Sequence, residues 1–376
     1  MELKRLEHPR NLRATIYAYL RKHIGTPSPI RPDRFADGTA GPALALPVRR
    51  RTLAVMPPLP TLSEIEAAAA LVCPVVPTTP QFSWPMLNAR VGIELWVKHE
   101  NHTALGAFKM RGGIVYFARL LEREPGIRGV IAATRGNHGQ SVAFAARRLG
   151  LAVVIVVPRG NSTEKNAAMR ALGAELIEHG EDFQSALEHS RQLAAARGLH
   201  AMPSYHHDLV CGIAVSALDF LRGAPPLDTV FVPIGMGSGI CAMMAARDAL
   251  GLKTKIVGVA SAGAPAIALS FEARRLIVHP VTTQLADGLA CSTPHPDALA
   301  HILQGAERIV RVTDDEVAAA IRVGFADTHN VIEGAAAAGL AAVIRERDSL
   351  NGRRVGLVLT GGNIDTAVLA GVLSAA

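Results

Sequence analysis

The sequence predicts an α/β protein whose mainly parallel sheets are flanked by helices. Short apolar runs rich in valine and isoleucine alternate with longer alanine-rich stretches of helical periodicity. This alternation is typical of parallel strands joined by helices. The chain has 376 residues, of which 49% are hydrophobic and only 4% aromatic. It can therefore bury a large, aliphatic core, and we expect two domains.

The net charge of +7 comes from the start of the chain. Residues 1–52 contain eleven Lys or Arg and four Asp or Glu, whereas the remainder contains 28 residues of each sign. We therefore expect residues 1–56 to form a basic, disordered leader in front of a neutral body. A neutral body argues against nucleic acid as a partner.

The sequence also argues against a membrane or secreted protein. No apolar run reaches the length of a membrane span, and the N-terminus lacks the apolar segment of a signal peptide. We therefore expect a cytoplasmic protein. The cysteines form no C-x-x-C pair and are expected to be buried, reduced thiols; they are Cys73, Cys211, Cys241 and Cys291.

The first predicted element begins at a capping box, because Thr61 and Glu64 have the required types and spacing. Further helices are expected at residues 141–149 and 240–250, each after a tight turn. Buried strands are predicted at residues 94–98, 129–133, 151–157, 174–177, 229–234, 255–260 and 354–358.

Lys109 has an unusual setting for a lysine. Phe108 precedes it, and glycines stand on both sides, at 106 and 112. Glycines allow the backbone to approach a flat cofactor, and desolvation would lower the pKa of the amine and make it nucleophilic. The alternative is a solvated lysine at the start of a helix.

The segment from Thr134 to Gln140 follows a predicted strand and precedes a helical pattern. A tight turn at a helix N-terminus presents backbone N–H groups and suits an anion such as a carboxylate. Asn137 and His138 add side-chain donors. The alternative is an ordinary strand-to-helix loop, which Asn and Gly favour as well.

The segment Gly235 to Gly239 has glycines at alternate positions, with Ser238 among them, between a strand and a helix. This pattern predicts a phosphate cradle. It is neither the G-x-G-x-x-G pattern of dinucleotide sites nor a Walker A loop. Thr360 stands directly after the last predicted strand, at the edge where α/β proteins place their sites.

These segments, in this order, resemble the serine/threonine dehydratase family of pyridoxal-5'-phosphate (PLP) enzymes, which have the tryptophan-synthase-β-like fold. The resemblance covers residues 57–376 and includes the stretches at Ala286–Leu289 and Glu333–Ala336. It implies a large PLP domain of residues 57–124 plus 208–376, with a small domain of residues 125–207 inserted. It also implies a homodimer.

The resemblance also implies a role for each singled-out residue. Lys109 would be the lysine linked to PLP, Phe108 would pack on the ring, and Asn137 would hydrogen-bond the ring's 3-hydroxyl. Thr360 would face the pyridine nitrogen. The phosphate would be held by Gly235, Met236, Gly237, Ser238 and Gly239, and the substrate carboxylate by Thr134, Asn137 and His138.

The implied activity is that of an ammonia-lyase. Such an enzyme would convert L-threonine, L-serine or a related 3-hydroxy amino acid to a 2-oxo acid and ammonia. A neutral hydroxyl from Thr360 cannot keep the pyridine nitrogen protonated as an aspartate would, which favours β-elimination over transamination. The alternatives are a 3-hydroxyaspartate ammonia-lyase, a β-replacing synthase, or a non-catalytic PLP- or amino-acid-binding protein.

Arg135 departs from the family pattern. Members that racemise their substrate have a hydroxyl there, and arginine does not replace it as a base because it stays protonated. This argues for dehydration and against racemisation. Arg135 could instead bind a second carboxylate of the substrate, as in 3-hydroxyaspartate, or be turned outward or held in a structural ion pair.

No metal is expected at the site, because residues 259–266, where metal-dependent relatives place carboxylates, contain none. Two acidic residues of the resembling stretches have open roles. Asp287 could cap a turn before Gly288. Glu333 could lie near the amine end of the cofactor or simply start a helix.

Overall fold

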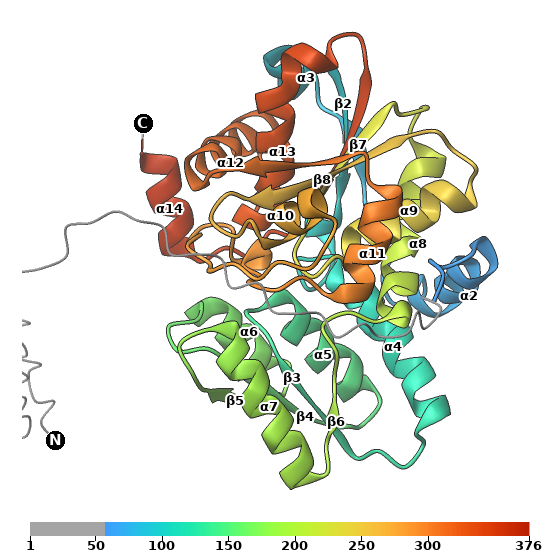
Figure 1. The fold of residues 1–376 in the computed structure, drawn as a ribbon, viewed down its shortest axis with the longest axis vertical. Coiled ribbons are helices and arrows are strands. Elements are labelled where there is room, and N and C mark those ends of the chain that lie inside the picture. Colours follow the sequence, from blue (N-terminus) through green and yellow to red (C-terminus); the bar gives the residue numbers. More distant parts are fainter. Residues whose placement is uncertain (1–56, 376) are drawn as a thin grey trace, which may run out of the picture. The chain divides into compact units, whose positions relative to one another are not determined.

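The computed structural model describes residues 57–375, so the predicted leader of residues 1–56 lies outside the described residues. Two sheets organise the described chain (Figure 1). The larger has the strand order β1-β2-β10-β7-β8-β9, and all its neighbouring pairs are parallel except β1 with β2. The smaller has the order β5-β4-β3-β6 and is parallel throughout. The α/β prediction is confirmed.

The elements alternate along the chain as predicted. The strands are β1 (Gln81–Ser83), β2 (Glu94–His99), β3 (Gly129–Ala133), β4 (Ala152–Val157), β5 (Glu175–Glu178), β6 (His200–Ala201), β7 (Thr229–Pro233), β8 (Lys255–Ser261), β9 (Arg308–Val312) and β10 (Arg354–Leu359). The α-helices are α2 (Leu62–Val72), α3 (Pro85–Val91), α4 (Lys109–Arg123), α5 (Asn137–Arg148), α6 (Thr163–Ala171), α7 (Phe183–Arg197), α8 (His207–Gly223), α9 (Ser238–Ala249), α10 (Ala266–Ala273), α11 (Pro296–Gly305), α12 (Asp314–Thr328), α13 (Gly334–Glu346) and α14 (Thr366–Ser374). The 3₁₀ turns are η1 (Glu100–His102), η2 (Asp287–Leu289) and η3 (Arg347–Leu350).

Helices cover both faces of each sheet. Helices α9 and α8 lie on one face of the six-stranded sheet, and α13 with α12 on the other (Figure 1). Helix α7 packs on one face of the four-stranded sheet, and α5 on the other. Helix α4 packs against both α8 and α5, so it contacts both layers. The strands of the smaller sheet all come from residues 129–201; the domain boundaries at 124 and 207 stay a prediction.

Three local expectations can be compared with the structure. The capping box is confirmed, since Thr61 and Glu64 cap each other's backbone at the start of α2. The helix expected from residue 141 begins earlier, at Asn137, because Gly136 serves as its N-cap. The expectation of four buried cysteines is wrong at Cys73, which is exposed at the end of α2, and Cys291 is only half-buried; Cys211 and Cys241 are buried as expected. No helix among the described residues is long and apolar enough to cross a membrane.

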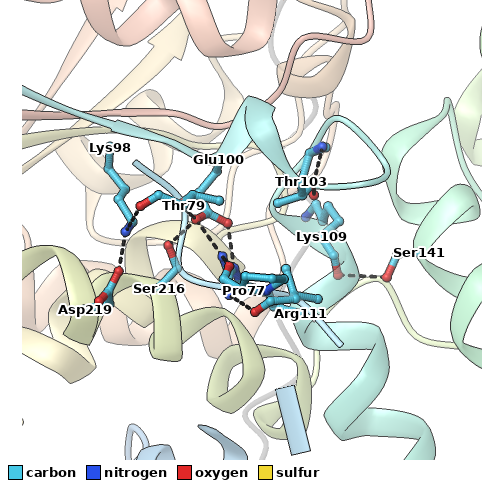
Figure 2. Close-up of polar contacts among 12 residues, drawn as sticks. Pro77, Thr79, Lys98, Glu100, Thr103, Lys109, Arg111, Ser141, Ser216 and Asp219 are labelled. Atoms are coloured by element: carbon cyan, nitrogen blue, oxygen red, sulfur yellow. Dashed lines mark hydrogen bonds and ion pairs between the residues drawn. The ribbon is translucent and has the colours of Figure 1, made fainter. Parts of the chain in front are cut away.

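A buried ion pair anchors the start of α4. The Arg111 guanidinium donates to both carboxylate oxygens of Glu100, at 2.7 and 3.1 Å, and both side chains are at most 2% exposed (Figure 2). Thr79 and Ser216 each donate a hydroxyl to Glu100 at 2.6 Å. Burial alone would raise the pKa of Glu100, but Arg111 and these hydrogen bonds hold it below its usual range. The carboxylate therefore stays ionised.

A second buried cation lies beside this pair. The Lys98 ammonium donates to the carbonyl of Thr79 at 2.8 Å and to the Asp219 carboxylate (Figure 2). Two of the Arg111 nitrogens also donate to the carbonyls of Val76 and Pro77. The segment before β1, the end of β2 and the start of α4 are thus tied together by one polar network. This network fixes the backbone two residues after Lys109.

Breaking the Arg111–Glu100 pair should destabilise the protein strongly. Arg111→Met leaves a buried, ionised Glu100 without its cation, so we expect a loss of about 3–5 kcal/mol in the free energy of unfolding. Arg159→Ala is the matched control, because its pair with Glu181 is exposed and should contribute less than about 1 kcal/mol. Denaturant unfolding of both variants measures the difference. Similar losses in the two variants would contradict the assigned role of Arg111.

Candidate active site

The predicted site residues lie together around one cavity between the two sheets. Those that line it are Phe108, Lys109, Thr134, Arg135, Asn137, His138, Gly235, Met236, Gly237, Ser238, Gly239 and Thr360. Three of the segments follow β2, β10 and β7, which are neighbours in the larger sheet, and the fourth follows β3 of the smaller one. The carboxyl ends of parallel strands meet at one edge of a sheet, which explains why distant segments converge.

Lys109 is the first residue of α4. Its Nζ lies 3.1 Å from the Ser238 hydroxyl and 4.9 Å from the centre of the Phe108 ring. Burial lowers its pKa to about 8, although the nearby Cys291 and Glu333 oppose the shift. About a tenth of this amine is therefore neutral near pH 7, far more than in an ordinary lysine, and the neutral form is the nucleophile.

The loop before Lys109 is fixed to the end of β10. The Phe108 N–H donates to the Thr360 carbonyl at 3.0 Å, and Gly362 donates to Gly106 at 2.9 Å. Gly106 has a φ of +65°, and a Cβ there would lie 2.6 Å from the Asn363 side chain. The sequence suggested that Gly106 makes room for a cofactor; in the structure the glycine makes room for Asn363.

The loop from Gly235 to Gly239 leads into α9, which begins at Ser238. Two of its three glycines, Gly235 and Gly237, cannot carry a side chain without strain. A Cβ at Gly235 would lie 2.5 Å from the Gly288 carbonyl oxygen, and Gly237 has a φ of +99°. The start of a helix with free N–H groups and a buried serine hydroxyl suits a phosphate. No Lys or Arg belongs to this loop, so the backbone and the hydroxyl are its donors.

The start of α5 offers donors for a second anion. The Thr134 hydroxyl accepts the N–H groups of Gly136 and Gly139, at 3.0 and 3.2 Å. The N–H groups of Asn137 and His138 have no acceptor among the described residues. Burial, with a smaller contribution from the charge of Lys109, lowers the pKa of His138 to about 3, so its ring is neutral at pH 7. The Nε2 atom of His138 is buried without a partner, as expected of a group that binds a ligand.

Arg135 has no ion pair with any described residue, and its Nε is buried without a hydrogen-bond partner. The nearby Asp182 already accepts hydrogen bonds from Ser185 as the N-cap of α7. Within the described residues no carboxylate lies within ion-pair distance of Arg135, although its charge contributes to the lowered pKa of Asp182. The guanidinium belongs to the cavity wall.

The Thr360 hydroxyl is free for a ligand. Thr360 is 7% exposed and stands at the end of β10. Its carbonyl is used by Phe108, whereas its hydroxyl makes no hydrogen bond to another described residue. The cavity therefore has a group for each part of PLP. The amine of Lys109 fits the aldehyde, the start of α9 fits the phosphate, and this hydroxyl fits the ring nitrogen.

Sequence reasoning missed Lys165, which is almost fully buried and reaches the cavity from α6. Its ammonium contacts Asp287 at 2.5 Å and Glu333 at 3.4 Å. Asp287, the first residue of η2, therefore forms an ion pair. Glu333 directly precedes α13, but its side chain makes no capping hydrogen bond to that helix. A signal was present in the sequence: a lysine in the first turn of a helix opposes the helix dipole and needs a partner.

The prediction that the site holds no metal stays a prediction. Among residues 57–375, one group has the types and spacing of a metal site: Glu64, His207 and Cys211, between α2 and α8. It lies outside the cavity. Burial raises the pKa of the Cys211 thiol to about 11, although Arg119 opposes the shift, so this sulfur is a thiol and a weak ligand.

Comparison with known proteins agrees with the geometry of the cavity. Residues 72–361 match the family described as pyridoxal-phosphate dependent enzyme. The chain belongs to this family, its cofactor is PLP, and the predicted fold is confirmed.

The similar proteins include two ammonia-lyases. The L-threo-3-hydroxyaspartate ammonia-lyase of Saccharomyces cerevisiae is 30% identical over 84% of this chain and 97% of its own length. The L-threonine ammonia-lyase of Thermotoga maritima is 31% identical over 84% of this chain and 78% of its own length. A solved PLP-dependent aspartate racemase is 29% identical, with a TM-score of 0.78, and the match covers 83% of this chain and 99% of that one.

The reactivity of Lys109 should follow its lowered pKa. In cofactor-free protein, we expect an amine-directed reagent to modify Lys109 half-maximally near pH 8, because the amine is neutral above its pKa of about 8, whereas an ordinary lysine titrates near about 10.4. Peptide mapping after labelling across pH 6–11 measures this. Preloading with PLP followed by borohydride should block the same peptide. A label that PLP does not block would contradict the assignment of Lys109 as the cofactor lysine.

Proposed function

We propose that the protein is an ammonia-lyase for L-threonine, L-serine or a related 3-hydroxy amino acid, which it converts to a 2-oxo acid and ammonia. The observation that carries the proposal is the position of Lys109, a partly neutral amine beside the start of α9 and facing the same cavity as Thr360. Two ammonia-lyases that are 30% and 31% identical to the chain support it. A cytoplasmic homodimer is part of the same proposal.

Different cavity residues would bind the cofactor and the substrate. PLP, when bound, supplies an electron sink for the carbanion formed at the substrate's α-carbon. Ser238 and the backbone of the Gly235–Gly239 loop would hold its phosphate, and Thr360 would place a neutral hydroxyl near its ring nitrogen. The N–H groups at the start of α5 would bind the substrate's α-carboxylate, with the neutral His138 beside them.

Lys109 is the group that moves a proton. With PLP bound, Lys109 Nζ would be the base that takes the α-proton, because its lowered pKa keeps part of the amine neutral near pH 7. Arg135 cannot serve as a second base, because a guanidinium stays protonated. The arrangement therefore favours loss of the β-hydroxyl over racemisation, although an aspartate racemase has a similar fold.

The proposed reaction can be tested directly. With PLP bound, the protein should release a 2-oxo acid and ammonia from at least one 3-hydroxy amino acid in a panel, without added metal. Lys109→Ala should reduce this activity by several orders of magnitude and keep the fold, because the other cavity amine, Lys165, is held in its charged form by Asp287 and Glu333 and is a poor base. Chiral analysis of remaining L-serine should show almost no D-isomer. Rapid formation of the D-isomer, or turnover only with an added thiol nucleophile, would contradict the proposal.

A second candidate is a 3-hydroxyaspartate ammonia-lyase, and the unpaired Arg135 favours it. Lys165 is already paired with two carboxylates, and the start of α5 can serve the α-carboxylate. Arg135 therefore remains for a second carboxylate on the substrate's β-carbon. The Saccharomyces cerevisiae relative acts, by its name, on L-threo-3-hydroxyaspartate.

Arg135→Ala separates the two substrates. Loss of a charge-assisted hydrogen bond is worth about 1.5–3 kcal/mol, so kcat/KM for 3-hydroxyaspartate should fall roughly ten- to hundredfold. The value for L-threonine should change little. Arg159→Ala, at an exposed arginine, is the control. An equal loss on both substrates would assign Arg135 to the α-carboxylate or to structure instead.

A further inference from the structure

Five polar side chains form a continuous chain beside the cavity, called here the cross-layer chain. Asn363 Nδ2 donates to Asn137 Oδ1 at 2.8 Å, and Asn137 Nδ2 donates to Glu333 Oε1 at 2.6 Å. Glu333 Oε2 lies 3.4 Å from the Lys165 ammonium, which donates to Asp287 Oδ2 at 2.5 Å. Each link joins one sheet layer to the other. Asn137 and Lys165 come from α5 and α6, whereas Asp287 begins η2, Glu333 precedes α13 and Asn363 follows β10.

Three glycines make room for this chain. A Cβ at Gly106 would lie 2.6 Å from Asn363 Oδ1, one at Gly136 would lie 2.4 Å from Lys165 Cδ, and one at Gly361 would lie 2.4 Å from Glu333 Oε1. These glycines come from three of the four segments that surround the cavity. The close packing holds the members of the chain in one arrangement.

The charges of the chain reinforce this arrangement. Burial would lower the pKa of Lys165, but Glu333 and Asp287 raise it to about 12. The ammonium therefore stays charged between Asp287 and Glu333, which both belong to the other layer. Burial raises the pKa of Glu333, and the charge of Lys165 opposes that shift. Two further contacts tie the same part of α6 across the gap: Ser162 donates to Asp365, and the Thr366 N–H donates to Glu164 at 2.8 Å.

The chain also decides which atom of the Asn137 amide faces which partner. Its oxygen accepts from Asn363, and one of its two N–H bonds points to a carboxylate oxygen. In the flipped amide, the oxygen would face Glu333 and the nitrogen would face the Asn363 donor, so both hydrogen bonds would be lost. The second N–H of Asn137 thus remains as a donor of fixed orientation.

We propose that Lys165 and Glu333 are positioning residues: they orient the Asn137 amide and hold the two sheet layers together over the cavity. Neither residue needs to react with the substrate. When the layers separate, every link of the chain breaks, so the orientation of Asn137 is coupled to closure. The proposal rests on the use of this cavity for PLP and not on the identity of the amino-acid substrate.

The test uses the full-length protein with PLP as the probe. Lys165→Met keeps the aliphatic part of the side chain, which lies over Gly136, and removes the charge. Glu333→Leu removes the oxygen that accepts from Asn137, whereas Glu333→Gln keeps an accepting oxygen. Lys255→Met is the matched control, because its pair with Glu307 is exposed and distant from the chain. The measurements are the PLP dissociation constant, the absorption maximum of bound PLP, and amide exchange of residues 162–166 in cofactor-free protein.

We expect Lys165→Met and Glu333→Leu each to weaken PLP binding about tenfold or more. Lys165→Met should also speed exchange at the start of α6, and Glu333→Leu should shift the absorption maximum. Glu333→Gln should retain most of the PLP affinity and most of the original absorption maximum. The variant that combines Lys165→Met with Glu333→Leu should lose less PLP affinity than the sum of the two single losses. Unchanged binding and exchange, or fully additive losses, would overturn the proposal. None of these measurements involves turnover, so a failed ammonia-lyase assay is a separate result.

Discussion

The buried pair of Arg111 and Glu100 is the interaction on which the site depends. A charge that loses its partner in the protein interior is costly, so neither side chain can move alone. Thr79 and Ser216 satisfy the remaining lone pairs of the carboxylate, which makes the network complete. Arg111 stands in the first turn of α4. The position of Lys109, the first residue of that helix, follows from this anchor.

The N-termini of three helices supply much of the cavity's capacity to bind anions. Lys109, Asn137 and Ser238 each begin a helix, and the positive ends of these helices add to the charge of Arg135 in the cavity wall. Such a site attracts a phosphate and a carboxylate. Burial disfavours a charged lysine and lowers the pKa of Lys109, although Cys291 and Glu333 oppose the shift.

The fold and the cavity residues could be predicted because the signals are local. A buried strand, a glycine turn and a helix start can be recognised within about fifteen residues, and the ends of parallel strands then bring such turns together. The start of α5 was placed four residues late, because Asn137 and His138 read as loop residues when the N-cap is not known. The exposure of Cys73 depends on which face of α2 is covered, which the local pattern does not give.

The contacts across the cavity could not be predicted. Asn137, Lys165 and Glu333 lie far apart in the sequence, and nothing local indicates that they meet. Arg135 has no ion-pair partner among the described residues, and for the same reason this could be recognised only in the structure. The sequence suggested that Gly106 makes room for a cofactor, whereas the side chain for which it makes room, that of Asn363, comes from the other end of the chain.

The most direct measurement of the central claim is a crystal structure of the protein with PLP bound. The account predicts continuous density from Lys109 Nζ to the cofactor, the phosphate at the start of α9, and an Asn137 amide that still contacts Glu333 while its second N–H faces the ring. Cofactor bound elsewhere, or joined to a different lysine, would contradict the assignment of this cavity as the active site.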